Sequence, residues 1–196
     1  MVGQDGFSAD VTKAVQAAVK KFGRLDYGVN NVGITGPIGA LVDYDLDAAR
    51  RIIAVGLMPV ISCMQAEFKV MIPSGGGAIV NTSSIWELTG SGNFVAYPAA
   101  KYGIAGATRA AAMEVAEQGI RVNAIAPGFT FTPMISDQGL MIKRGSAEYR
   151  AAAAHHPMNP WGEPEDMAEG IAWLLSDKAS FVTGTVLSID GGFVAR

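Results

Sequence analysis

The sequence has few charged residues and a single cysteine. Charged residues are 17% of the 196 residues and hydrophobic ones 49%, whereas typical soluble domains carry roughly 25% charged residues. This balance excludes intrinsic disorder, which requires low hydrophobicity and high net charge. Cys63 cannot form an internal disulfide, so the fold does not depend on an oxidising compartment, and we expect a cytoplasmic protein.

The chain also lacks an excess of positive charge and a long apolar run. It has 15 basic and 18 acidic residues and a pI near 5.3, which leaves no basic surface for nucleic acid or an anionic membrane. The longest strongly apolar uncharged run, between Arg51 and Glu67, has fifteen residues, fewer than the roughly 20 that span a bilayer. The N-terminus has no secretory pattern. We therefore expect neither a nucleic-acid nor a membrane partner.

What the chain contains is an alternation of helical and extended patterns. Apolar spacing predicts helices at 11–22, 45–71 (kinked at Pro59), 97–117, 146–155 and 164–175. Asp10 is placed to cap the first helix and Gly23 to end it. Short apolar runs predict strands at 25–30, 78–84, 121–126 and 186–190. This rhythm predicts a single α/β domain over 1–196, with a doubly wound parallel sheet in three α/β/α layers.

One pair of residues carries chemistry. Tyr97 and Lys101 are four residues apart on one predicted helix, so their side chains share a face. A nearby ammonium favours phenolate and should lower the pKa of Tyr97 towards a useful range. Ser84, at the exit of the preceding strand, could hydrogen-bond a substrate oxygen. By itself the Tyr-x-x-x-Lys spacing is more often a solvated helical pair.

The surrounding motifs change that reading. They are, in order, Asn30-Asn31-Val32-Gly33, Ser83-Ser84, Tyr97-Pro98-Ala99-Ala100-Lys101, Arg121-Val122-Asn123 with Pro127-Gly128 and Thr132, and Asp190-Gly191-Gly192. Together they resemble the classical short-chain dehydrogenase/reductase family over nearly the whole chain. The resemblance implies a Rossmann-like fold and an NAD- or NADP-dependent oxidoreductase that interconverts an alcohol and a ketone or aldehyde, with a small-molecule substrate.

The resemblance also implies roles for individual residues. Tyr97 would be the catalytic acid/base, Lys101 would tune it and bind the nicotinamide ribose, and Ser84 would position the substrate. The remaining cofactor contacts would come from Asp10, Val11, Asn30, Gly33, Pro127, Gly128 and Thr132. The hydride belongs to the cofactor, while the protein supplies orientation and proton transfer.

Two features depart from the family pattern. The family's glycine-rich Thr-Gly-x-x-x-Gly-x-Gly turn, which receives the cofactor diphosphate at a helix N-terminus, does not occur in the 196 residues. We therefore expect a chain without its first βαβ unit, starting with the tail of the third strand at 6–10. Gly56 stands where the family commonly has an asparagine that holds a water of the proton relay.

Loss of a first unit would expose the strand at 25–30 as a sheet edge. We predict that this edge is covered by a non-native pairing, by a second chain, or by residues 1–9. The many small residues of the 97–117 helix favour close helix contacts, and we expect a homodimer or homotetramer formed through the helices 45–71 and 97–117.

Several alternatives stay open from the sequence. The chain could be a catalytically silent binding or assembly protein on the same fold. Met134, Met141 and Met158, with Phe129, Phe131 and Trp161, could line an apolar substrate pocket or simply pack a lid over 132–161. Cys63 is best explained by core packing. His155-His156 has no accompanying ligand cluster, so we predict no metal.

Overall fold

The computed structural model describes residues 4–136, 141–158 and 161–195. Its centre is a parallel sheet in the order β1-β2-β3-β4, formed by β1 (Tyr27–Asn30), β2 (Gly77–Thr82), β3 (Ile120–Pro127) and β4 (Val186–Ile189). The register pairs Asn30 with Asn81 and Asn81 with Ala124. The predicted α/β class and parallel sheet are confirmed.

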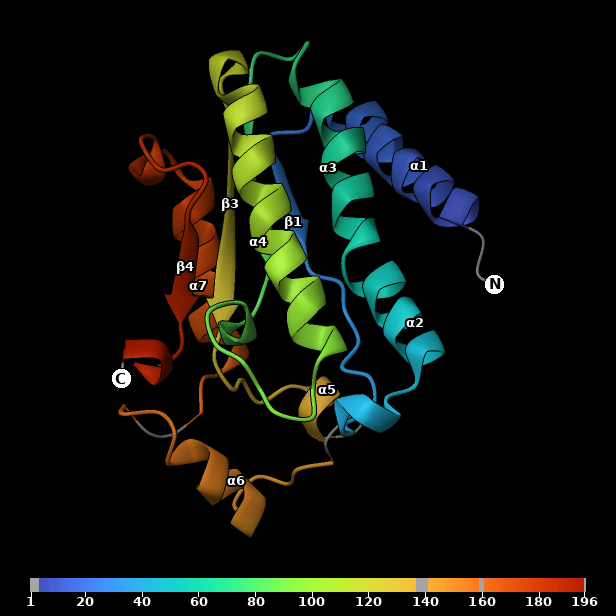
Figure 1. Ribbon diagram of the computed structural model, residues 1–196. Helices are drawn as coiled ribbons and strands as arrows, with labels where there is room; N and C mark the ends of the chain where they lie inside the picture. Colours follow the sequence, from blue (N-terminus) through green and yellow to red (C-terminus); the bar gives the residue numbers. More distant parts are fainter. Residues whose placement is uncertain (1–3, 137–140, 159–160, 196) are drawn as a thin grey trace.

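Helices cover both faces of this sheet (Figure 1). On one face lie α1 (Gln4–Phe22), α3 (Met58–Met71) and α4 (Ala96–Val115), with α3 between the other two. On the other face lies α7 (Pro164–Leu175), against β2, β3 and β4. The shorter helices are α2 (Leu46–Gly56), α5 (Pro133–Ser136) and α6 (Ala147–Ala153). These last two lie below the carboxyl end of the sheet in Figure 1.

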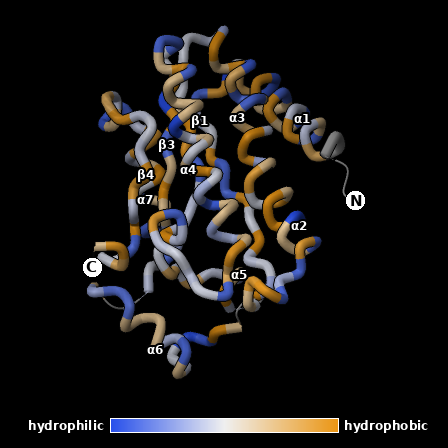
Figure 2. The backbone as a smooth tube through the Cα atoms, viewed as in Figure 1, coloured by the Kyte–Doolittle hydropathy of each residue, from blue (hydrophilic) through white to orange (hydrophobic). Residues whose placement is uncertain are grey.

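Alternation along β2 divides the core into two layers. Ile79 packs with Val60, Met64 and Ile104 from α3 and α4, whereas Val80 packs with Leu174 of α7. Successive strand residues point to opposite faces, so a continuous apolar strand serves both layers. Figure 2 shows many hydrophobic positions along α3, the helix that lies between α1 and α4.

The expectation for the N-terminal residues is wrong. Residues 6–10 do not form the tail of a strand, because α1 already begins at Gln4. Asp10 therefore lies inside the helix, paired with Lys13 at 3.2 Å, and does not cap it. The described residues 4–9 belong to α1 and do not cover the edge of β1. Within the described chain β1 pairs with β2 alone, so coverage of its outer edge by a second chain stays a prediction.

The long helix predicted at 45–71 is divided in two. α2 ends at Gly56 and α3 begins at Met58, with Pro59 in its first turn, where a missing N–H is tolerated. Leu46–Met71 is long and apolar enough to cross a membrane, with a mean hydropathy of 1.4. This is weak evidence for a span, since core helices of soluble proteins pass the same test, and here the two segments pack against α1 and α4.

Candidate active site

A cavity opens at the carboxyl ends of the strands, where ligands bind in open α/β sheets. It has a volume of about 770 Å³, within the usual range for small-molecule sites. Its walls come from the loop after β1, the exit of β2, the start of α4, the loop after β3, and α7. Among its lining residues are Gly33, Ser84, Tyr97, Lys101, Pro127, Gly128 and Thr132. Seven of the predicted site residues thus meet at one cavity.

Lys101 is held at the base of this cavity. Its Nζ donates a 2.8 Å hydrogen bond to the backbone oxygen of Thr82 and lies 5.6 Å from the centre of the Tyr97 ring. A Cβ on Gly33 would stand 3.5 Å from this Nζ. Burial lowers the pKa of Lys101 to about 8, so the side chain is mainly an ammonium at neutral pH.

Tyr97 lies in the first turn of α4, with its ring stacked on Phe94 at 5.1 Å between centroids. Burial raises the pKa of its phenol, and a hydrogen bond with the Ser84 side chain lowers it by a smaller amount. The expectation that Lys101 lowers this pKa is wrong for this structure: burial is the larger cause, because removal of water disfavours phenolate, and the smaller lowering comes from Ser84. At neutral pH Tyr97 carries its proton.

Ser84 is buried directly after β2. Its Oγ accepts a 3.3 Å hydrogen bond from the backbone N–H of Trp86 and caps the short helix Ile85–Glu87. The preceding Ser83 also lines the cavity, and its Oγ donates to the backbone oxygen of Lys101 at 3.0 Å. The two serines have different tasks: Ser83 ties the strand exit to α4, and Ser84 faces Tyr97.

Three predicted cofactor contacts lie elsewhere. Asp10 and Val11 are within α1, and neither lines the cavity. The Asn30 side chain is buried, and its Nδ2 donates to Glu67 at 3.1 Å and to Asn81 at 2.9 Å. In the described structure Asn30 holds β1 to β2 and α3.

Of the aromatic and methionine side chains that could line a substrate pocket or pack a lid, only some line the cavity. Phe129 and Met134 line the cavity. Phe131 and Trp161 pack with Tyr149 of α6 and do not line the cavity. Met141 and Met158 are exposed. Cys63 is partly buried, and burial raises its pKa to about 11, which suppresses thiolate. Within the described ranges, no three His, Cys, Asp or Glu residues are grouped to hold a metal.

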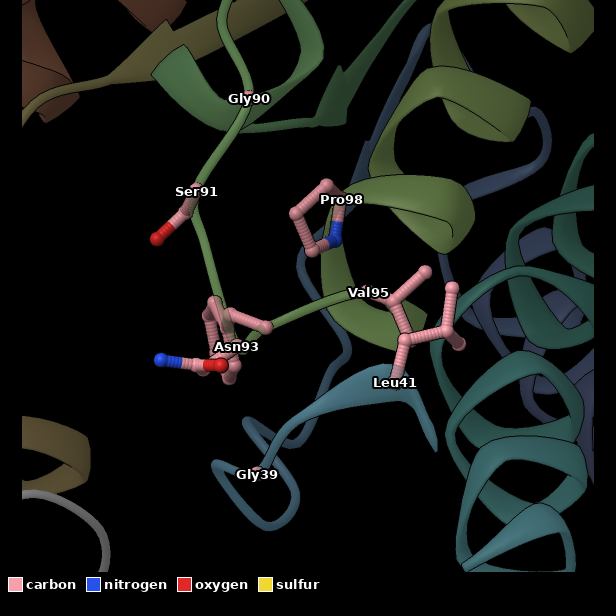
Figure 3. A pocket seen from close by; sticks show the side chains of 8 residues that line it. Gly39, Leu41, Gly90, Ser91, Asn93, Val95 and Pro98 are labelled. Atoms are coloured by element: carbon pink, nitrogen blue, oxygen red, sulfur yellow. The ribbon is translucent and has the colours of Figure 1, made fainter. Parts of the chain in front are cut away.

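A second, smaller pocket of about 310 Å³ adjoins the cavity and shares Ser91 and Phe94 with it. Figure 3 shows it between the loop at 90–95 and the segment around Gly39 and Leu41. The two segments are joined by a 2.8 Å hydrogen bond from the Gly39 N–H to the Asn93 oxygen. These loops form the outer wall beside Tyr97.

Comparison with known proteins agrees with this geometry. The sequence family described as "Enoyl-(Acyl carrier protein) reductase" matches residues 7–194. The cyclohexanol dehydrogenase of Acinetobacter sp. (strain SE19) is 40% identical over 189 residues, which are 95% of this chain and 71% of that protein. The chain belongs to the short-chain dehydrogenase/reductase family. Membership makes it an NAD(P)-dependent oxidoreductase and leaves the choice between NAD and NADP open.

Two further relatives of this short-chain dehydrogenase/reductase are informative. The cis-4-hydroxycyclohexanecarboxylate dehydrogenase of Sinomonas cyclohexanicum is 44% identical over 186 residues, covering 94% of this chain and 72% of that protein. The solved structure "ElxO with NADP Bound" superposes with a TM-score of 0.89 at 36% identity, covering 96% of this chain and 75% of that one. Both likenesses cover more than nine-tenths of this chain.

The residues present fit the nicotinamide ribose of such a cofactor, but not its diphosphate. Thr82 lines the cavity, and its buried hydroxyl has no hydrogen-bond partner among the described residues. Together with the Lys101 ammonium and the side-chain-free surface of Gly33, it suits a ribose hydroxyl group. No glycine-rich turn for the diphosphate occurs in the 196 residues. Sequence reasoning missed Thr82, although its position at the polar end of an apolar strand was a usable signal.

The packing of α2 on α4 explains why position 56 is a glycine. It is the buried last residue of α2, and a Cβ there would stand 3.3 Å from the Cβ of Ala100. The missing side chain lets α2 pack closely on α4, next to Lys101. An asparagine at this position would have to push α2 and α4 apart by a few tenths of an ångström.

Proposed function

We propose that this cavity reduces a ketone to a secondary alcohol, and catalyses the reverse oxidation, with Tyr97 as the proton donor and acceptor. The supporting observation is that Ser84, Tyr97 and Lys101 line one cavity, with the Lys101 Nζ 5.6 Å from the centre of the Tyr97 ring. A bound nicotinamide cofactor supplies or removes the hydride. Ser84 orients the substrate oxygen towards Tyr97, and Lys101 binds the ribose.

The protonation state of Tyr97 favours one direction at neutral pH. Because burial raises its pKa, the phenol holds its proton and can donate it to a carbonyl oxygen that becomes a hydroxyl. Oxidation needs the opposite transfer, from the alcohol to phenolate. The oxidation rate should therefore be low near pH 7 and rise as the pH increases towards the pKa of Tyr97.

The cavity wall favours a substrate with an apolar ring. Aromatic and aliphatic side chains form most of it, including Ile38, Ile85, Trp86, Phe94, Met134 and Ile171. Two relatives are named for substrates that carry a cyclohexane ring with a hydroxyl group. We propose an alicyclic secondary alcohol and its ketone as the substrate pair.

The test is a titration of the protein with NADH and with NADPH, followed by turnover with cyclohexanone. We expect one cofactor to bind and support reduction, since the Lys101 and Thr82 groups remain available. Absence of binding of both cofactors at millimolar concentration would overturn the proposed activity for this chain. Retained binding without turnover of any cyclic ketone would overturn the substrate class alone.

We propose that the chain assembles as a homodimer or homotetramer through α2, α3 and α4. Apolar side chains are exposed along the latter two helices: Met58, Ile61, Tyr102 and Met113. Exposed apolar side chains on these helices would be covered if the helices met a second copy of the chain. Sedimentation of the wild type should give a dimer or tetramer, and Met113→Glu should shift it towards the monomer. A monomeric wild type at micromolar concentration would contradict this.

A further inference from the structure

His156 contacts the cavity wall from behind. It is only 3% exposed and does not line the cavity, yet its Nε2 accepts a 3.1 Å hydrogen bond from the backbone N–H of Phe129. Pro127, Gly128, Phe129, Thr130 and Thr132 all line the cavity. A side chain from the segment after α6 therefore fixes the backbone of the loop that follows β3.

The loop has few other anchors. The Gly128 N–H donates to the Ile189 oxygen at 2.9 Å, the Gly162 N–H donates to the Phe129 oxygen at 3.0 Å, and the Phe131 N–H donates to the Gly162 oxygen at 3.0 Å. These three hydrogen bonds join backbone to backbone. The hydrogen bond from the Phe129 N–H to His156 joins the backbone to a side chain. The hydrogen bond to His156 comes from a side chain of a distant segment, so a substitution can remove it without altering the path of the chain.

The packing around the ring leaves little freedom. Phe129 and Phe193 lie against the imidazole, with centroids at 5.5 and 5.4 Å. A Cβ on Gly128 would stand 3.0 Å from Nε2 and 2.8 Å from the Asp190 Cα. Glycine at 128 therefore lets the loop approach both the imidazole and the C-terminal turn. The ring holds together three segments that are distant in the sequence.

We propose that His156 is a positioning residue, which holds the loop 128–132 in place against a bound nicotinamide by accepting the Phe129 N–H at Nε2. An acceptor at Nε2 must be unprotonated, so in the neutral ring the proton lies on Nδ1. This role rests on the proposed function, because it assigns this loop to the nicotinamide side of the cavity.

The test compares two substitutions. His156→Gln places an amide oxygen near the former Nε2 and can still accept a hydrogen bond, whereas His156→Leu keeps apolar bulk without an acceptor. His155→Leu, at the exposed neighbouring position, is the matched control. Amide hydrogen exchange at Phe129, followed by NMR without ligand, reports the bond directly. Exchange should be about tenfold faster in His156→Leu and close to wild type in the other two proteins.

The functional readout is the dissociation constant of NADH or NADPH, whichever binds the wild type. We expect about tenfold weaker binding in His156→Leu and near-normal binding in His156→Gln. Equal Phe129 exchange in the wild type and His156→Leu would overturn the inference, and so would unchanged cofactor affinity despite faster exchange. Absence of binding by the wild type itself would overturn the proposed function, while the exchange result would still show whether His156 anchors the loop.

Discussion

Two groups of buried polar side chains lie close together around β2, and they differ in how completely they are paired. The internal network consists of Asn30, Glu67, Asn81 and Thr108. Asn30 donates to Glu67 and Asn81, and Asn81 donates to Thr108 at 2.9 Å. The proposed catalytic group consists of Ser84, Tyr97 and Lys101, which line a cavity.

This difference distinguishes side chains that stabilise the fold from side chains that are available to a ligand. A buried polar group is tolerated when its hydrogen bonds are made within the protein, and the internal network meets this condition by joining β1, β2, α3 and α4. In the second group the Ser84 Oγ accepts from the Trp86 N–H and the Lys101 Nζ donates to the Thr82 oxygen, and the cavity-facing side leaves capacity for a ligand. Substitutions in the first group should reduce stability, and substitutions in the second should reduce turnover.

The largest expected effect is that of Tyr97→Phe. Loss of the hydroxyl removes the proton donor, so kcat should fall by about 10³-fold, while the ring keeps its stacking on Phe94 and the circular dichroism spectrum stays unchanged. Tyr102→Phe, on the exposed side of the same helix, is the control and should retain full turnover. Activity of Tyr97→Phe above a tenth of wild type would mean that another group transfers the proton.

Next comes Lys101. Lys101→Met removes the ammonium and should weaken cofactor binding about 100-fold, because hydrogen bonds to charged groups are strong. In the wild type the pKa of Lys101 is lowered to about 8, so its charge is present below that pH and lost above it. Cofactor titrations at pH 7 and 9.5 should show weaker binding at the higher pH. Lys69→Met, exposed on α3, should leave the affinity and its pH dependence as they are.

A smaller effect is expected from breaking the internal network. Asn81→Ala removes one of the two acceptors of the Asn30 amide and the donor to the Thr108 hydroxyl, which should lower the free energy of unfolding by about 2 kcal/mol. Urea unfolding measures this, with Gln16→Ala on the exposed face of α1 as the control. kcat at a temperature well below the transition should remain near wild type. A loss of kcat without a loss of stability would reverse the assignment of the two groups.

The smallest effect concerns Glu67. Burial raises the pKa of its carboxyl above the ordinary 4.5, and the Asn30 hydrogen bond lowers it by less. Between the unfolded and the folded pKa values the native state holds more protons, so stability falls as the pH rises through the folded pKa. Glu67→Gln keeps an acceptor for Asn30 and removes this titration.

Urea midpoints measured from pH 4 to 9 test the titration of Glu67. The wild type should lose stability towards high pH relative to Glu67→Gln, and the two should approach each other at low pH. Glu117→Gln, an exposed substitution after α4, should follow the wild type. Parallel curves for the wild type and Glu67→Gln would mean that the carboxyl titrates as it does in the unfolded chain.

Most elements could be predicted because their signals are local. Helix α7 agrees at both ends with the predicted 164–175, since Pro164 starts it and apolar spacing continues to Leu175. The error at 6–10 arose because the resemblance suggested a strand there, whereas the chain continues the helical turns of α1 back to Gln4. Gly28 weakened the prediction of β1, yet its missing side chain leaves room for the Glu67 carboxylate.

In the candidate site, too, local signals predicted some features and not others. Spacing alone placed Tyr97 and Lys101 on one helix face, because a helical turn brings residues four apart together. Nothing local indicated that the Asn30 side chain turns inward to Glu67, since their pairing depends on how α3 packs over β1. The same holds for His156 and Phe129, which are joined across 27 positions of the chain.

The sequence by itself determined the alternation of helices and strands, the parallel sheet, and the types of side chain at its carboxyl edge. These properties follow from periodicity and from residues that are neighbours along the chain. Only the tertiary structure decided which buried polar groups are paired and which face a cavity, and hence the direction in which burial shifts the pKa values of Tyr97, Lys101 and Glu67. Burial and pairing depend on segments that meet only after folding, because desolvation is a property of the whole surroundings of a group.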